Sequence, residues 1–333
     1  MRVDVDVSEA AAADGSGVGI VCRVQDTSGG GPNGYYTFVV GNGFYRIVKA
    51  VGSTNYWLGS YSQPDGYKTK GTNHVRAECV GNWFVLSLNG RKLIQAQDTA
   101  DNAYTTGGVG LWTETTQAGF KALYKNFSID DASNDQFSQP QPVKAAAAMG
   151  KVAFQDDFSD PSSGWPTQNG DITVEYADSG GYHMQFTQPN TSTVSLLPDQ
   201  TFDNVTIQAD VTKNDGTDEG SLFGIVCRAQ DENNYYRFVV GGDGTYGIMK
   251  TKDGNDTWLA YVQLQQSAIQ PGNDTNHLRA DCIGNKLTLY ANSTRLAQVT
   301  DSDFKTGQVG LQAATTDAGL DLLFANYEVR QAR

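Results

Sequence analysis

The five residues GIVCR at positions 19–23 return unchanged at positions 224–228. Two further stretches repeat with them: YYTFVVG at 35–41 returns as YYRFVVG at 235–241, and NHVRAEC at 73–79 returns as NHLRADC at 276–282. A spacing of about 200 residues is much longer than the unit of a solenoid, so the repeat predicts two whole domains in tandem.

The two copies differ at their beginnings. Residues 152–205, ahead of the second copy, have no counterpart ahead of residue 2. We therefore expect the chain to start inside a domain. We predict an amino-terminally incomplete domain over 1–130, a linker over 131–151 and a complete domain over 152–333. The linker is expected because prolines at 140 and 142 and a glycine at 150 flank the alanine run at 145–148.

Strand signals dominate both copies: short runs rich in Val, Ile, Tyr, Phe and Thr are separated by Gly, Asn and Asp. Strands are predicted at 18–22, 35–40, 45–49, 57–61, 74–79, 84–88 and 108–113, and again at 223–227, 235–240, 246–250, 258–262, 277–282, 287–291 and 307–313. Many short strands joined by turns predict an all-β fold, two tandem antiparallel β-sandwiches of the jelly-roll type, the first lacking its amino-terminal strands.

The four cysteines occupy matched places in the two copies, so we predict one disulfide within each, Cys22–Cys79 and Cys227–Cys282. Strand alternation puts each cysteine on the apolar side of its strand, toward the core. Four buried free thiols are the alternative. Bonded cysteines indicate an oxidising compartment outside the cytoplasm, and hence a secreted or cell-surface protein.

The formal net charge of −13 argues against nucleic acid and anionic membrane surfaces as partners. No apolar run approaches the roughly 18 residues that a membrane-spanning helix needs. The first ten residues carry three acidic side chains and no apolar segment, so they do not read as a signal peptide.

Several motifs of the second copy resemble a known family: FQDDFSDPSSGW at 154–165, FGIVCR at 223–228, YYRF at 235–238, GQVGL at 307–311 and FANYEV at 324–329. Together they are similar to the concanavalin-A-like lectin/glucanase superfamily, in its laminin-G-like and 3-keto-disaccharide-hydrolase-like branch. The resemblance covers the second copy and most of the first. It implies two stacked, curved antiparallel sheets in a domain that is usually extracellular and often serves enzymes or adhesins as a glycan-binding or spacing module.

No catalytic arrangement is evident. Glucanases of that superfamily carry a Glu-x-Asp-x-x-Glu pattern, and none of the seven glutamates of this chain stands in such a spacing. A retaining glycosidase needs two carboxyl groups about 5–5.5 Å apart. The three histidines, His74, His183 and His277, are too sparse for a metal triad within one copy, and His74 and His277 are expected to serve turns. We predict no enzymatic activity, with a glycoside hydrolase as the remaining rival.

A charged cluster is the candidate ligand site. If the cysteines point inward, the charged residues beside them should emerge together on the opposite face, close to a tyrosine. Planar donors and acceptors beside an aromatic ring suit sugar recognition. The alternative is a solvated sheet face with a cross-strand ion pair. The candidate residues are Arg23, Tyr35, Arg76 and Glu78 in the first copy and Arg228, Tyr235, Arg279 and Asp281 in the second.

Two further features have both a functional and an ordinary explanation. Trp57 and Trp258 occupy matched positions and could stack on a sugar ring or pack in the sandwich. The loop at 214–219 suggests calcium, with Asp215, Asp218 and Glu219 as ligands, or a solvated turn. No other cofactor is predicted.

The residues present only in the second copy should form roughly four strands, around 152–154, 172–176, 182–186 and 193–197. Without them the first copy would expose sheet edges and one side of its core. We expect strands from an upstream segment or from a neighbouring copy to complete it, the latter giving a head-to-tail assembly. The interpretation is a non-enzymatic extracellular glycan-binding or adhesion protein. The rival is a structural subunit of a surface or filamentous assembly.

Overall fold

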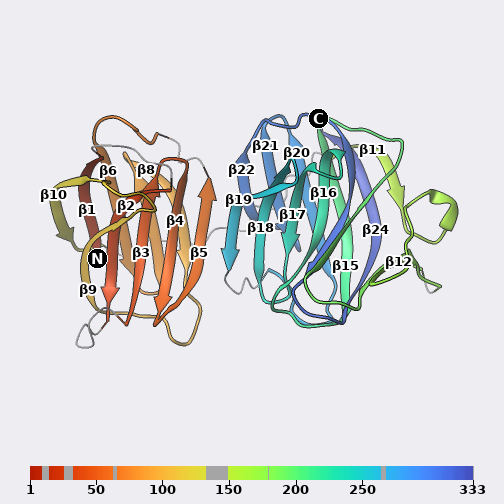
Figure 1. The fold of residues 1–333 in the computed structure, drawn as a ribbon, viewed down its shortest axis with the longest axis horizontal. Helices are drawn as coiled ribbons and strands as arrows, with labels where there is room; N and C mark the ends of the chain where they lie inside the picture. Colours follow the sequence, from red (N-terminus) through yellow and green to blue (C-terminus); the bar gives the residue numbers. More distant parts are fainter. Residues whose placement is uncertain are drawn as a thin grey trace. The chain divides into compact units, whose positions relative to one another are not determined.

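The computed structural model describes residues 1–9, 15–25, 33–62, 66–132, 149–178, 180–263 and 268–332. These residues form antiparallel strands, with one short 3-10 turn at Pro161–Ser163 (Figure 1). The chain divides into two compact units near residue 139, called unit 1 and unit 2. None of the described segments is a helix with the length and hydrophobicity that crossing a bilayer requires.

Unit 1 consists of two antiparallel sheets. One has the strand order β10-β1-β6-β7-β8 and the other contains β5-β4-β3-β2-β9. The strands are β1 (Arg2–Glu9), β2 (Gly17–Val24), β3 (Gly34–Gly41), β4 (Phe44–Val51), β5 (Thr54–Ser62), β6 (Asn73–Val80), β7 (Trp83–Leu88), β8 (Arg91–Gln97), β9 (Gly108–Glu114) and β10 (Ala122–Asp130).

Unit 2 repeats this arrangement and adds to it. One sheet has the order β12-β13-β24-β15-β20-β21-β22, with β11 also paired to β24, and the other contains β14-β23-β16-β17-β18-β19. The strands are β11 (Met149–Asp156), β12 (Ile172–Tyr176), β13 (Tyr182–Phe186), β14 (Thr191–Leu196), β15 (Val205–Asp215), β16 (Ser221–Asp231), β17 (Asn234–Val240), β18 (Thr245–Lys252), β19 (Asn255–Gln263), β20 (Asn276–Ile283), β21 (Lys286–Ala291), β22 (Thr294–Thr300), β23 (Gln308–Thr315) and β24 (Leu320–Ala332).

The predicted fold class is confirmed: both units are all-β with antiparallel sheets, and the described part of unit 1 has no equivalents of β11–β14. The four strands expected in the extra segment of the second copy are present. They fall within β11, on β12 and β13, and across β14. The sequence prediction missed six strands: β1, β8 and β10 in unit 1 and β15, β22 and β24 in unit 2. Of these, β8 and β22 are half-buried and have no strong apolar run.

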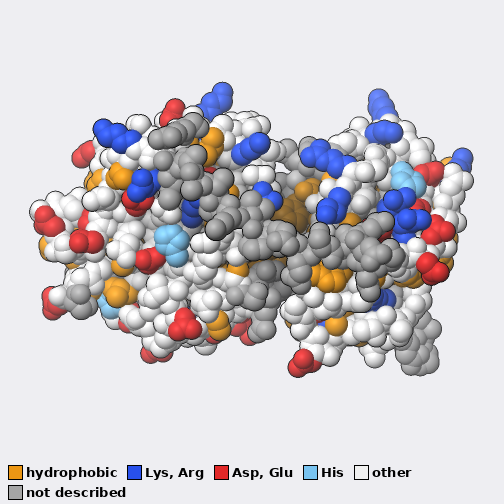
Figure 2. Space-filling view, turned by 180° about the vertical axis from the view of Figure 1, so that it is seen from behind, with side chains coloured by type: hydrophobic (Ala, Val, Ile, Leu, Met, Phe, Trp, Pro, Cys, Tyr) orange, Lys and Arg blue, Asp and Glu red, His pale blue; other side chains and the backbone are white. Residues whose placement is uncertain are grey.

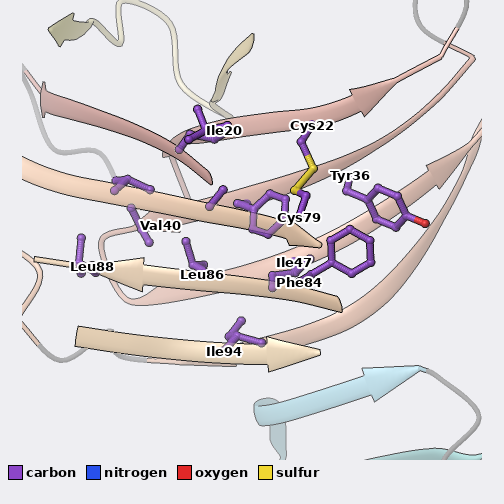
Figure 3. Close-up of a cluster of buried hydrophobic side chains, with 14 of the residues drawn as sticks. Ile20, Cys22, Tyr36, Val40, Ile47, Cys79, Phe84, Leu86, Leu88 and Ile94 are labelled. Carbon is purple, nitrogen blue, oxygen red and sulfur yellow. A yellow bond between two sulfur atoms is a disulfide. The ribbon is translucent and has the colours of Figure 1, made fainter. Parts of the chain in front are cut away.

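The core of each unit lies between its two sheets. In unit 1, large side chains such as Tyr36, Phe38 and Phe84 are fully buried there. Figure 3 shows this layer, with the Cys22–Cys79 disulfide joining β2 of one sheet to β6 of the other. The Cys227–Cys282 disulfide does the same in unit 2, from β16 to β20. Both predicted pairings are confirmed.

A buried polar network accompanies the core of unit 2. The Tyr236 hydroxyl donates to Asp301 Oδ1 over 2.5 Å and accepts from the backbone N–H of Phe304 over 3.1 Å. Lys250 Nζ lies 2.7 Å from the same carboxylate. Burial, with the hydrogen bond to Asp301, raises the pKa of Tyr236 far above its usual range. Unit 1 has the same network in Tyr36, Lys49, Asp98 and Tyr104.

Replacing both cysteines of unit 2 (Cys227→Ala with Cys282→Ala) is expected to destabilise that unit. The disulfide closes a separation of 55 residues, and the chain-entropy model gives about 4 kcal/mol for a loop of that size. Hydrogen–deuterium exchange of the full chain should show lost protection across unit 2 while unit 1 keeps its protection. Peptide mapping without reductant that found these thiols free in the unmodified protein would contradict the assignment.

The Tyr236→Phe variant removes the hydroxyl at the centre of the buried network. It leaves the Phe304 N–H without its acceptor, which should lower the free energy of unfolding by about 1–3 kcal/mol. Chemical denaturation measures this loss. The matched control is Tyr56→Phe, because Tyr56 is 41% exposed and its change should leave stability unaltered. Equal stabilities of the two variants would contradict the prediction.

Candidate functional site

The candidate site lies on the outer face of the sheet that contains β1, β6 and β10 in unit 1, and of its equivalent with β15, β20 and β24 in unit 2. Strand alternation creates this face. Along β20, Leu278, Ala280 and Cys282 are fully buried, so the intervening residues from His277 onward point away from the core. The same holds for β6 in unit 1.

Three side chains meet on this face in unit 2. His277 Nδ1 lies 2.7 Å from Asp210 Oδ1, and the Asn326 amide donates to Asp210 Oδ2 over 2.7 Å. The remaining imidazole nitrogen, Nε2, lies 3.2 Å from Gln208 Oε1. The His277 side chain is 45% exposed. Three neighbouring strands therefore hold one imidazole in a fixed orientation at the surface.

Unit 1 contains the same three residue types in the same arrangement. His74 Nδ1 lies 2.8 Å from Asp6 Oδ1, and the Asn126 amide donates to Asp6 Oδ2 over 2.7 Å. Here the Nε2 atom lies 2.8 Å from Asp4 Oδ1. We call each set the Asp–His–Asn trio: Asp6, His74 and Asn126 in unit 1, and Asp210, His277 and Asn326 in unit 2. Figure 2 shows pale-blue histidine side chains at the surface with red acidic side chains beside them.

A backbone irregularity places the asparagine of each trio. Asn126 and Asn326 have φ of 53° and 51°, in the left-handed region. The strand register shifts at the same level, between Asp4 and Asp6 and between Gln208 and Asp210. Asparagine tolerates this conformation better than most residues, and a bulge turns a side chain away from the regular alternation. The bulge thus directs each amide at the neighbouring aspartate.

In the trio of unit 1, two hydrogen bonds stabilise the charged carboxylate of Asp6. The hydrogen bond from Asn126, followed by that from His74, lowers the pKa of Asp6 below its ordinary value. Above that pKa the carboxylate accepts from both partners, so Nδ1 of His74 is a donor. The other ring nitrogen, Nε2, faces Asp4 Oδ1 in unit 1 and Gln208 Oε1 in unit 2. An oriented carboxylate beside a half-exposed imidazole can accept from a hydroxyl group.

The unit 2 trio borders an open hollow of about 520 Å³. Carboxylates, amides and the imidazole line most of it, together with Tyr327, which is 1% exposed. The lining residues are Gln155, Asp156, Asp157, Gln208, His277, Asn326, Tyr327 and Glu328. Hydrogen-bonding groups that converge on a solvent-accessible hollow suit a small polar ligand.

Two arginines of the predicted ligand site lie elsewhere, and the prediction that they emerge on this face is wrong. Arg228 is 1% exposed, and its guanidinium donates to the backbone carbonyls of Asp203, Cys282, Gly284 and Phe304. Arg23 is 4% exposed and donates to the Tyr104 carbonyl. Both have φ near 54°, which breaks the strand alternation, so the side chains turn inward under the loops.

The other charged residues of the prediction do reach the outer face. Arg279 Nε donates to Asp281 Oδ1 over 2.8 Å, and Arg279 Nη2 donates to Asp281 Oδ2 over 2.9 Å. Both side chains of this ion pair are largely buried. Arg76 donates to Asp4 Oδ1 over 2.7 Å. Arg76 and Glu78 line a second hollow of about 250 Å³ together with Val85, Ser87, Gly90, Lys92 and Gln95.

The tyrosines of the prediction lie on the other sheet of each unit and provide no platform beside these charges. The Tyr35 ring lies 5.4 Å from that of Trp112, and Tyr235 is 7% exposed with the Arg237 guanidinium 5.5 Å from its ring. The predicted grouping of arginine, acid and tyrosine is therefore corrected. The disulfide joins facing sheets, so residues next to its two cysteines belong to different layers.

The matched tryptophans pack on sheet surfaces and stay partly exposed. Trp57 lies under the Arg46 guanidinium, 5.0 Å from its ring. Trp258 covers Gly247, where an added Cβ would lie 2.4 Å from the indole. Neither tryptophan is in the sandwich interior, and each has a packing partner that accounts for its position.

The proposed calcium loop already has internal partners. Asp218 Oδ1 lies 2.9 Å from Lys213 Nζ, and Asp215 Oδ1 accepts from the Gly216 N–H over 2.7 Å. Among the described residues, no group of three or more His, Cys, Asp or Glu side chains is arranged to hold a metal ion. Calcium at Asp215, Asp218 and Glu219 stays a prediction without matching geometry.

The residues that the sequence interpretation missed are the trio residues themselves. A signal was present, since all three occupy matched positions in the two copies: Asp6 with Asp210, His74 with His277 and Asn126 with Asn326. A histidine that is repeated together with an aspartate and an asparagine indicates a functional site more strongly than a histidine that is considered alone.

No protein-family model matches the chain, and no curated protein matches it. Among solved structures, the carbohydrate-binding module CBM66 from Bacillus subtilis is 21% identical over 51% of this chain and 96% of its own, with a TM-score of 0.42. A beta-glucanase from Bacillus licheniformis is 12% identical over 54% and 98%, with a TM-score of 0.41. The carbohydrate recognition domain of Emp47p is 14% identical over 56% and 99%, with a TM-score of 0.40. These similarities extend over about half of the chain and do not identify what it binds.

The Asn126→Gly variant tests the electrostatics of the trio. Glycine keeps the left-handed backbone but removes the amide that stabilises the Asp6 carboxylate, so the pKa of Asp6 should rise toward its ordinary value. Because the folded-state pKa is depressed, the stability that Asp6 contributes is present above about pH 4 and is lost as pH falls through the folded value. The variant should reduce this contribution.

Carboxyl-carbon NMR over a pH titration measures that change. The matched control is Asn326→Gly, because Asn326 also has a positive φ of 51° but donates to Asp210 in unit 2. An Asp6 titration that is the same in Asn126→Gly and in the unmodified protein would contradict the assigned contact.

Proposed function

We propose that this chain is a non-enzymatic glycan-binding protein that acts outside the cytoplasm. The observation that carries the proposal is the duplicated Asp–His–Asn trio, with its partly exposed imidazole, on the same sheet face of both units. A carboxylate, an imidazole and an amide fixed relative to one another supply donors and acceptors at set angles. Recognition of sugar hydroxyls requires such an arrangement.

The charge of the site favours a ligand without negative charge. Asp156, Asp157 and Glu328 line the hollow of unit 2 beside Asp210, and the chain as a whole carries −13. Sulfated or uronic sugars would meet repulsion there, whereas neutral or amino sugars would not. The proposed ligand class is therefore a neutral or basic glycan, such as part of a cell-surface polymer.

The compartment and the domain limits are part of the same proposal. Two disulfides suit an oxidising, extracellular environment. We propose domains at 1–130 and 152–333, both in the laminin-G-like branch, joined by a linker over 131–151, of which residues 133–148 lie outside the described part of the chain. A structural or adhesive role in a surface assembly is the second candidate, supported by an apolar face on unit 1 that is described below.

The test is binding of the full chain to a glycan array, followed by titration calorimetry with the best neutral ligand. Because each unit has a trio, the variant carries both His74→Ala and His277→Ala. The affinity should fall by about tenfold or more, since each change removes one of the two hydrogen bonds that orient its aspartate and also removes a ligand contact.

His183→Ala is the matched control. His183 also pairs with an aspartate, with Nε2 2.6 Å from Asp321 Oδ1, but it belongs to neither trio. Its removal should leave glycan affinity unchanged in protein that melts cooperatively. Equal binding by the double variant and the unmodified protein would reject the site, and release of shorter sugars from a glycan would reject the non-enzymatic assignment.

A further inference from the structure

Unit 1 exposes large apolar side chains that point toward its core. Ile129 of β10 pairs with Val3, and Leu111 of β9 pairs with Ile20. Directly paired residues share a sheet face, and both partners are fully buried. Yet Ile129 is 51% exposed and Leu111 is 44% exposed, and Phe127, two residues before Ile129, is 42% exposed. We call Leu111, Phe127 and Ile129 the open face.

The same three positions are closed in unit 2. Their equivalents Leu311, Tyr327 and Val329 are at most 1% exposed. Strands β11 and β13 pair with β24, and β14 pairs with β23. Aromatic side chains of the same segment surround Tyr327, with ring centroids at 6.3 Å for Phe154, 6.4 Å for Phe158 and 4.9 Å for Trp165. Unit 2 thus shows what kind of polypeptide covers this face.

The edges of the sheets lead to the same conclusion. In unit 1, β10 and β9 are the last strands of their sheets, whereas their equivalents β24 and β23 are interior strands. A terminal strand has backbone N–H and C=O groups available for another strand. Of the six large hydrophobic residues that are exposed in the described part of the chain, four lie on β9 or β10: Leu111, Leu123, Phe127 and Ile129. Free edges and exposed apolar side chains coincide here.

We propose that the open face of unit 1 binds a polypeptide segment of the same chemistry as residues 149–197. That segment adds antiparallel strands to the edges of β10 and β9 and places aromatic side chains against Phe127. Backbone pairing supplies affinity and the apolar side chains supply specificity, as in other cases of strand addition. The open face lies on the side of the sheet opposite to the trio, and the test below measures binding of a polypeptide, so its outcome does not depend on glycan binding. In unit 2 the covering segment also supplies Gln155, Asp156 and Asp157 to the hollow beside the trio.

A second copy of the chain is a poorer occupant. If it gave up its own residues 149–197, it would uncover Tyr327 and Val329 in its own unit 2. If it paired β10 with β10, it would extend only one sheet and leave β9 as an edge. A segment of the 149–197 kind covers both edges at once, as it does within unit 2.

The test adds a synthetic polypeptide of residues 149–197 to the full chain and follows binding by native mass spectrometry and titration calorimetry. We expect a one-to-one complex. The variants Phe127→Asp and Ile129→Asp should weaken it by about tenfold or more, because a charge would be buried against apolar rings. A polypeptide with Trp165→Ala should also bind more weakly.

Ile283→Asp is the control, since Ile283 is 38% exposed in unit 2 and should not affect the complex. All variants replace exposed side chains, and circular dichroism melts check that they remain folded. The proposal is overturned if the polypeptide does not bind, or if the aspartate variants bind it as the unmodified chain does. It is also overturned if light scattering finds a dimer that Phe127→Asp dissociates, because a second copy would then occupy the face.

Discussion

The disulfide between the two sheets, with the arginine that follows its first cysteine, is the constraint on which the rest of unit 2 depends. Cys227 and Cys282 are fully buried and join β16 to β20 across the core. The guanidinium of Arg228 donates to several backbone carbonyl groups around the disulfide, including that of Cys282 itself. A buried charge is tolerated only with such complete pairing. Because Cys282 must face inward, His277 faces outward on the same strand.

Most of the strands and both disulfides could be predicted because their signals are local or duplicated. Alternation along 73–79 and 276–282 correctly separates inward Val or Leu, Ala and Cys from outward His, Arg and acid. The same reasoning failed one residue after Cys22 and Cys227. There a positive φ turns the arginine inward, and the sequence contains no glycine at that point to suggest it. A bulge set by tertiary hydrogen bonds cannot be recognised from side-chain type alone.

The candidate site was less predictable than the fold because it is built from distant parts of the chain. Asp6 meets His74 across 68 residues and Asn126 across 120. Such contacts require the strand order β10-β1-β6, in which the last, first and sixth strands of unit 1 are neighbours. The imidazoles of His74 and His277 are also about half exposed, so the alternation of buried apolar residues along the strands did not reveal them as part of a site. Duplication was the available signal, since unrelated surface residues have no reason to recur as a set.

The duplicated trio has a consequence for how a polymer would be held. If each trio binds a sugar, as proposed, one chain carries two contact points for a repeating ligand, and a polymer released by one of them would stay bound through the other. Its local concentration at the vacated contact point is of the order of mM for a short flexible connection. Retention then depends on how densely the polymer repeats its sugar, and weak individual contacts are compatible with long residence. Two weak sites on one chain would hold a polymer much more tightly than its free monomer. A single strong site would bind the two with similar affinity.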